Sequence, residues 1–342
     1  MKTINLLLNI IGFITLLLSS LCQANITLYG RVNTALEFNN IESQRTDIKQ
    51  RNASSRFGLK GQETIGFDHI IEFQIENGFD STGTSSGKLA NRETFIGINN
   101  NDGHWRIGTN ELPSYTLFDA TVTKFHDTGN ASYLQTPNQS MSALGDIGSR
   151  ISNSFIYKSP SLLNFNAALL FSDAHPMIAG TSVQKIIDGN IMYQNTTFTA
   201  GFGFRTYQDS TALQHNTLFI IATKYTIPYF LDISAAYERG DYRSTARQID
   251  KLFLSTQYNY NAFAFIASAG LAGNVHYQGQ SQPNTRAHQI TFGFSYTFSK
   301  RTQLYMYFSQ LRNQREASYQ FLDNTQRGQS NQSLTFGIRH NF

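Results

Sequence analysis

Six basic residues lie in stretches where polar and apolar side chains alternate. In the extended stretch "ITLYGRVNTALEF" (26–38), Arg31 faces away from Leu28 and Val32, because successive side chains of a strand point to opposite faces. Cations on a face that lines water would attract anions and orient water in a narrow opening. The candidate site with this chemistry consists of Arg31, Arg56, Lys60, Arg92, Arg106 and Arg339.

Apolar neighbours predict which way each of these cations points. If the apolar side chains face outward, the alternating cations face inward. In each stretch, the outward apolar residues and the inward cations are as follows: Phe57 and Leu59 outward with Arg56 and Lys60 inward, Phe95 outward with Arg92 inward, Trp105 and Ile107 outward with Arg106 inward, and Leu334, Phe336 and Ile338 outward with Arg339 inward. An alternative interpretation is that these cations are simply solvated or paired with Glu37, Glu72 and Glu76, which are also expected to point inward.

Motifs for other kinds of chemistry are missing from the sequence. The eight histidines are scattered, and no two have the i, i+4 spacing of a helical zinc site. No phosphate-binding glycine loop occurs. The 27 basic and 23 acidic residues are interspersed, which argues against a nucleic-acid surface. We therefore expect no catalytic residues, no metal or other cofactor and no nucleic-acid partner.

Period-two alternation predicts sixteen strands and an all-β fold. Asn, Gln, Ser, Thr, Tyr, Phe and Gly are common relative to helix formers, which favours strands joined by polar loops. The predicted strands are 26–39, 54–65, 69–79, 91–98, 105–111, 150–158, 164–172, 186–194, 196–207, 216–226, 230–240, 248–258, 262–271, 287–298, 302–312 and 331–342.

Long and short connections alternate between these strands. In an up-and-down antiparallel barrel, every second connection lies at the same rim, so this alternation predicts one rim with long loops and one with tight turns. Outer-membrane barrels have this asymmetry. The interior of a sixteen-stranded barrel is too wide for side chains to fill. Its polar face should therefore line water while its apolar face meets lipid.

The N-terminal stretch "MKTINLLLNIIGFITLLLSSLCQA" has the features of a secretory signal peptide. It has an early lysine, an apolar segment and a small-residue end at Ala24. We expect residues 1–24 to be a signal peptide and residues 25–342 a single transmembrane β-barrel domain. Cleavage would also remove Cys22, the single cysteine of the chain. Beyond this segment, no run approaches the ~20 apolar residues of a membrane helix.

Several motifs together resemble a known family. They are "ITLYGRVNTALEF" (26–38), "SSRFGLKGQETIG" (54–66), "IIEFQIENGF" (70–79), "NRETFIGI" (91–98), "HWRIGTNELP" (104–113) and the terminal "SLTFGIRHNF". With these motifs the chain resembles the trimeric general porins of Gram-negative outer membranes, of the neisserial and related type. The resemblance implies a sixteen-stranded antiparallel barrel, a homotrimer in the outer membrane, and passive diffusion of ions and small hydrophilic solutes.

In such porins the third long loop folds into the barrel and narrows it. Here the third long connection, 112–148, is the longest, and Asp119 and Asp127 would then face the inward cations across the opening. The cations outnumber these carboxylates, so a weak preference for anions is expected. The resemblance also implies contacts with membrane lipid and lipopolysaccharide, and recognition of Phe342 by the outer-membrane assembly machinery.

Three other functions remain open at this point. The chain could be a substrate-specific outer-membrane channel, a surface barrel that acts mainly in adhesion or binding, or a barrel enzyme whose residues come from distant strands. Sixteen strands argue against the enzyme, because enzyme barrels usually have fewer. Only scattered inward aromatic residues, such as Tyr29, Tyr305 and Tyr307, suggest a sugar path.

Overall fold

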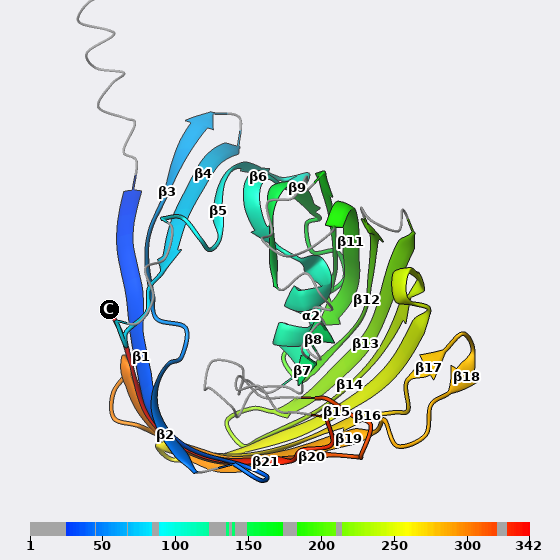
Figure 1. Ribbon diagram of the computed structural model, residues 1–342. Coiled ribbons are helices and arrows are strands. Elements are labelled where there is room, and N and C mark those ends of the chain that lie inside the picture. Colours follow the sequence, from blue (N-terminus) through cyan, green and yellow to red (C-terminus); the bar gives the residue numbers. More distant parts are fainter. Residues whose placement is uncertain are drawn as a thin grey trace, which may run out of the picture.

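The chain folds into a ring of antiparallel strands around an open interior (Figure 1). This computed structural model describes residues 25–44, 46–66, 68–83, 89–122, 135–136, 139–140, 149–173, 183–209, 214–319 and 327–342. The ring strands are β1 (Asn25–Ile41), β3 (Arg56–Gly66), β4 (His69–Gly78), β5 (Thr94–Asn100), β6 (Gly103–Glu111), β9 (Arg150–Lys158), β10 (Phe165–Asp173), β11 (Val183–Gln194), β12 (Phe198–Asp209), β13 (His215–Ile227), β14 (Leu231–Tyr242), β15 (Arg247–Tyr260), β16 (Phe263–Ala272), β19 (Ala287–Thr297), β20 (Thr302–Asn313) and β21 (Asn331–Asn341).

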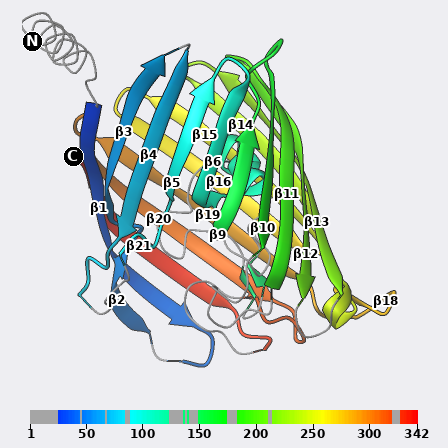
Figure 2. The same cartoon turned by 90° about the horizontal axis from the view of Figure 1, so that it is seen from above.

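The last strand closes the ring against the first. β21 pairs with β1 from Arg31 opposite Asn341 to Ile41 opposite Asn331. β1 pairs on its other edge with β3. Each ring strand between them pairs with the ring strands before and after it in the chain. Figure 2 shows these strands side by side along the wall. Within the described residues the barrel therefore has sixteen strands and no open edge, as the alternating pattern predicted.

Short elements lie in the long connections, and the sequence pattern missed them. β2 (Asp47–Asn52) pairs with the second half of β1. β17 (His276–Tyr277) and β18 (Gln280–Ser281) form a hairpin beside β15. The 3-10 helix η2 (Arg243–Thr245) joins β14 to β15. β7 (Gln135–Thr136) and β8 (Gln139–Ser140) pair only with each other. The helix α2 (Pro113–Thr121) lies inside the ring (Figure 1).

Burial along the strands is the reverse of that in a water-soluble barrel. On β1, Ile26, Leu28 and Leu36 expose 65%, 64% and 53% of their surface, whereas Arg31 and Glu37 expose 7% and 0%. Because exposed aliphatic side chains alternate with inward polar ones, the outside of the barrel is suited to lipid and the inside to water. In the part of the chain that is described, no helix is long and apolar enough to span a membrane.

Aromatic rings gather outside the barrel near the short turns. The ring centroids of Trp105 and Tyr157 are 4.2 Å apart, and those of Phe263 and Tyr296 are 4.8 Å apart. Such rings suit the boundary between lipid and water. Tyr29 points inward, and its hydroxyl donates a hydrogen bond to Glu76 at 3.0 Å.

The C-terminal residue completes the wall beside β1. The backbone N–H of Phe342 donates to the carbonyl of Gly30 at 3.0 Å, and the N–H of Gly30 donates back to the carbonyl of Phe342 at 3.1 Å. A side chain at position 30 would overlap the Phe342 ring, so glycine is required for this close approach.

Candidate functional site: the lumen and its inward helix

The cations predicted on strands lie on the inner wall. On β1 and β3, Arg31, Arg56 and Lys60 alternate with the outward Val32, Phe57 and Leu59. On β6, Arg106 alternates with the exposed Trp105 and Ile107, and on β21, Arg339 alternates with the exposed Phe336 and Ile338.

Glu76 forms ion pairs with two of the predicted cations. Arg92 Nε donates to Glu76 Oε1 at 2.5 Å, and Arg56 Nε lies 3.5 Å from Glu76 Oε2. The Tyr29 hydroxyl donates to the same Oε2. Two guanidinium groups therefore share one carboxylate, which leaves a net positive charge on this cluster.

Arg106 is held by two carboxylates and an aromatic ring. Its Nε donates to Glu72 Oε1 at 2.7 Å, and its Nη1 lies 3.5 Å from Glu93 Oε1. Its guanidinium carbon lies 4.0 Å from the centroid of the Phe95 ring, which is within cation–π range.

The contact with Arg106 corrects the predicted orientation of β5. Phe95 exposes 8% of its surface and faces inward, whereas Ile96 and Ile98 face outward. The expected outward position of Phe95 was wrong. Arg92 precedes β5, so its position does not follow from the alternation, and its ion pair with Glu76 directs it toward the wall instead.

Other inward cations contact uncharged groups. Lys60 Nζ lies 5.4 Å from the centroid of the Tyr29 ring, and Arg339 Nη2 donates to Gln303 Oε1 at 2.5 Å. Arg31 Nη2 donates to the Ser54 carbonyl at 3.2 Å. Lys60 and Arg339 have no carboxylate partner within the described residues.

The alternative of paired charges applies to part of the set. Glu37 accepts from Arg51 Nε at 2.8 Å, Glu72 pairs with Arg106, and Glu76 pairs with Arg56 and Arg92. The inner wall thus contains a network of ion pairs and, beside it, cations such as Lys60 and Arg339 that contact uncharged groups.

The N-terminus of α2 is fixed to the wall by a buried ion pair. The backbone N–H and the hydroxyl of Ser114 both donate to the Asp188 carboxylate at 2.6 Å. Arg205 Nε donates to Asp188 Oδ2 at 2.7 Å, and Arg205 Nη2 donates to Ser114 Oγ at 2.8 Å. The side chains of Asp188 and Arg205 are fully buried. A carboxylate at a helix N-terminus accepts from the free N–H groups and is favoured by the helix dipole.

The apolar side of α2 packs on β12 to β15. Leu117 and Phe118 expose 0% and 1%, and the Phe118 ring meets that of Phe253 edge to face at 5.2 Å between centroids. A Cβ at Gly201 would lie 2.6 Å from Leu117 Cδ1, so glycine allows the helix to approach β12. At the other end, Lys224 Nζ donates to the Ala120 carbonyl at 2.6 Å, which places a cation at the helix C-terminus.

The two predicted acidic residues have different outcomes. Asp119 lies on α2 and is half-buried, whereas Asp127 lies outside the described residues. Asp188, Arg205 and Glu93 are functional-site residues that were not predicted from the sequence. The same alternation could have found Asp188, because it follows the outward Ile187, which exposes 41% of its surface.

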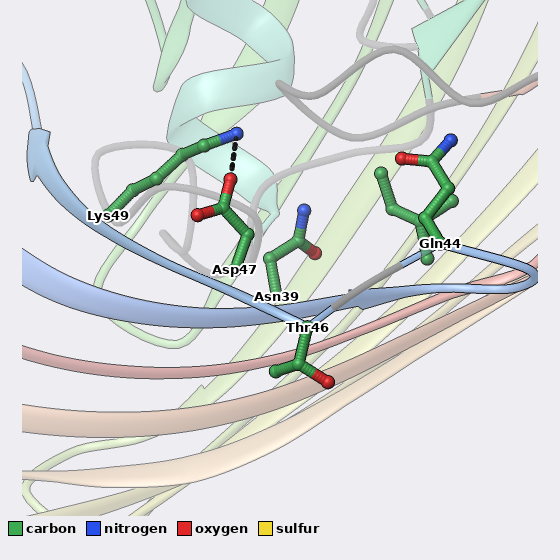
Figure 3. A pocket seen from close by; sticks show the side chains of 6 residues that line it. Asn39, Gln44, Thr46, Asp47 and Lys49 are labelled. Atoms are coloured by element: carbon green, nitrogen blue, oxygen red, sulfur yellow. Dashed lines mark ion pairs between the residues drawn. The ribbon is translucent and has the colours of Figure 1, made fainter.

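A polar cavity of 530 Å³ opens where β1 and β2 meet the loops. Lys49 Nζ and Asp47 Oδ2 lie 2.8 Å apart in this cavity. Figure 3 shows Lys49 turned toward Asp47, and Asn39, Gln44 and Thr46 also line the cavity. Within the described residues, no group of three or more His, Cys, Asp or Glu side chains could hold a metal ion.

Comparisons with known proteins agree with this geometry. A family profile described as "Gram-negative porin" matches residues 14–316. Outer membrane porin protein 32 of Delftia acidovorans is 28% identical over 95% of this chain and 96% of its own length. The major outer membrane protein P.IA of Neisseria meningitidis is 22% identical over 82% and 87%.

Solved structures show the same fold. An anion-selective porin from Comamonas acidovorans superposes with a TM-score of 0.77 at 21% identity, over 94% of this chain and all of that one. The trimer form of OmpT from Vibrio cholerae superposes with a TM-score of 0.67 at 15% identity, over 93% and 99%.

Proposed function

The chain belongs to the Gram-negative porin family and forms an outer-membrane channel for passive diffusion, and we propose that this channel prefers small anions. The observation that carries the proposal is the charge of the wall from β3 to β9. Among the described residues of this wall, six cations lie near four carboxylates, so the wall has a net charge of +2. The cations are Arg56, Lys60, Arg92, Arg106, Arg150 and Lys158, and the carboxylates are Glu72, Glu76, Glu93 and Glu111.

Arg31 and Arg339 extend this surface across the closure of the barrel. They lie on β1 and β21, where Asn33 is opposite Arg339 and Arg31 is opposite Asn341. α2 lies against β11 to β14, across the interior from β3 and β4 (Figure 1). A solute that passes between them meets a one-sided positive wall, and fixed charges of one sign lining a pore select against ions of the same sign.

The side of the opening that faces these cations has few carboxylates. Asp119 supplies one carboxylate from α2, and Asp127 would supply a second. With cations in excess, the field across the opening attracts anions and orients water, which disfavours apolar solutes. The name of one solved relative, an anion-selective porin, is consistent with the proposal.

The working assembly is a homotrimer that acts as a passive channel and not as an enzyme. A trimer form is known for OmpT of Vibrio cholerae, which has a similar fold. The family to which the chain belongs is described as a porin family. The exposed aliphatic belt contacts membrane lipid, and lipopolysaccharide borders the looped rim. Residues 1–24 act as the signal peptide, and Phe342 is recognised by the outer-membrane assembly machinery.

The proposal is tested with the protein reconstituted in a planar bilayer between unequal KCl solutions. If the channel prefers anions, the zero-current potential has the sign of the chloride equilibrium potential. A potential with the sign set by potassium would refute the proposal without affecting the assignment to the porin family.

A further inference from the structure

A second cavity lies between two long connections at the looped rim. Its volume is 730 Å³, within the ~300–1,000 Å³ of typical small-molecule sites. It lies between the β17–β18 hairpin and the connection that leads from β20 to β21. Figure 2 shows the hairpin at the looped end, at a distance from the inner wall of β3 and β4.

Backbone hydrogen bonds hold the walls of this cavity together. The N–H of Glu316 donates to the Asn284 carbonyl at 2.9 Å, and the N–H of Gln314 donates to the Arg286 carbonyl at 3.0 Å. The N–H of Gly328 donates to the Ala317 carbonyl at 2.8 Å. The two connections are thus joined through their main chains, so the cavity exists before a ligand enters it. A preformed site avoids part of the entropy cost of binding.

The charged lining of the cavity is mostly basic. It contains Arg247, Arg315 and Arg327 but one carboxylate, Glu316. Glu316 already pairs with Arg315 at 3.1 Å and with Arg327 at 2.9 Å. Arg247 has no carboxylate partner within the described residues. Three guanidinium groups and one carboxylate leave two positive charges facing the cavity.

The rest of the lining includes an apolar surface. Ile249 and Tyr319 are buried at 3% and 2% exposure, and Tyr277 and Val275 lie on the hairpin side. Burial raises the pKa of the Tyr319 phenol, so this group stays neutral at physiological pH and does not oppose an anion. Guanidinium groups beside aromatic and aliphatic surface match a ligand that is both anionic and apolar.

We propose that this cavity binds small organic anions that combine a carboxylate with an aromatic or branched aliphatic body. The carboxylate pairs with Arg247, and the body rests on Tyr277 and Tyr319. Passive diffusion does not require such a site. The proposed site is also independent of the ion preference of the lumen. Its effect would be to concentrate this class of solute at the channel entrance.

The test is isothermal titration of benzoate into the purified full-length protein in detergent micelles at low salt, with protein-free micelles as the blank. We expect saturable binding that Arg247→Gln weakens roughly three- to fivefold, the range expected from a solvent-exposed ion pair. Glu316→Gln should tighten binding, because it releases Arg315 and Arg327. The matched control is Arg243→Gln, an exposed arginine four residues away that does not line the cavity and should bind benzoate like the wild type.

Neutral and smaller probes separate the two parts of the proposed site. Benzamide, which has the ring without the charge, and acetate, which has the charge without the ring, should both bind more weakly than benzoate. The proposal is overturned if benzoate shows no saturable binding, if Arg247→Gln and Arg243→Gln have equal effects, or if benzamide binds as tightly as benzoate. Opposite effects of Arg247→Gln and Glu316→Gln cannot result from a general loss of folding.

Discussion

Arg106 contacts Glu72, Glu93 and the ring of Phe95 on the inner wall. A cation in such a network does not contribute a full isolated charge to the lumen, because neighbouring carboxylates offset part of its field. Its removal, however, leaves Glu72 and Glu93 without this partner. The net charge of the inner wall therefore depends on Arg106 more than the small exposed surface of this residue suggests.

Arg106→Gln should lower the anion-to-cation permeability ratio. The loss of one unit charge at about 4 Å in a water-like medium is worth ~1 kcal/mol, which corresponds to a change of roughly two- to fivefold. The measurement is the zero-current potential in a KCl gradient for the variant and the wild type.

Arg239→Gln is the matched control for this variant. Arg239 lies on the outward face of β14, where it is 3.8 Å from Asp250. It should leave the permeability ratio unchanged. If both variants shift the ratio equally, or if Arg106→Gln has no effect, lumenal charge does not set the selectivity.

At the scale of elements, α2 depends on partners that lie far away in the sequence. Ser114 at its start is joined to Asp188 on β11 and Arg205 on β12, both fully buried. A buried ion pair adds little net stability, but the loss of one partner leaves the other charge unsatisfied. This pair therefore specifies where the helix sits, and the helix position determines the width of the opening.

Asp188→Leu should destabilise the barrel by about 3–5 kcal/mol, because Arg205 stays buried without its carboxylate. It should also release α2, so single-channel conductance should rise and fluctuate. The measurements are urea unfolding in lipid vesicles and single-channel recording.

The double variant Asp188→Leu/Arg205→Met tests the cause of this loss. It removes both charges, so its free energy of unfolding should recover most of the way toward the wild type. Conductance should still differ, because Ser114 has lost its acceptor. Equal stability of the single and double variants would contradict the role of the ion pair.

The sequence predicted the strands well and the inward elements poorly. Strands such as β19 and β21 alternate apolar and polar residues over most of their length, and lipid on one side enforces that pattern. α2 is only nine residues long and β2 only six, so neither has a comparable periodic signal. Phe95 broke the pattern for a physical reason, because its ring lies beside the Arg106 guanidinium and not in lipid.

Most of the predicted cations, and the partners Glu72 and Glu76, follow from the same alternation, but the partner Glu93 does not. Glu93 lies just before β5, outside any strand, and binds Arg106 from there. The contact joins a loop to a strand, and no period in the sequence encodes it. Which inward charges remain available to solutes therefore requires the three-dimensional structure.

At the scale of the whole molecule, the closed barrel is a complete channel, and the proposed assembly is a trimer of such channels. We expect bilayer conductance to appear in steps grouped in threes, and the protein in mild detergent to have three times the mass of one chain. Light scattering of the unheated protein checks the mass. Single independent steps together with a monomeric mass would contradict the trimer.

The central claim is that excess positive charge in the lumen makes this porin prefer anions. The most direct test is the zero-current potential of the wild-type channel in a fixed tenfold KCl gradient, repeated from high to low total salt. The account predicts a potential set by chloride that grows as salt falls, because the Debye length rises from ~3 Å at 1 M to ~30 Å at 0.01 M. A potential set by potassium, or a chloride potential that does not change with salt, would contradict it.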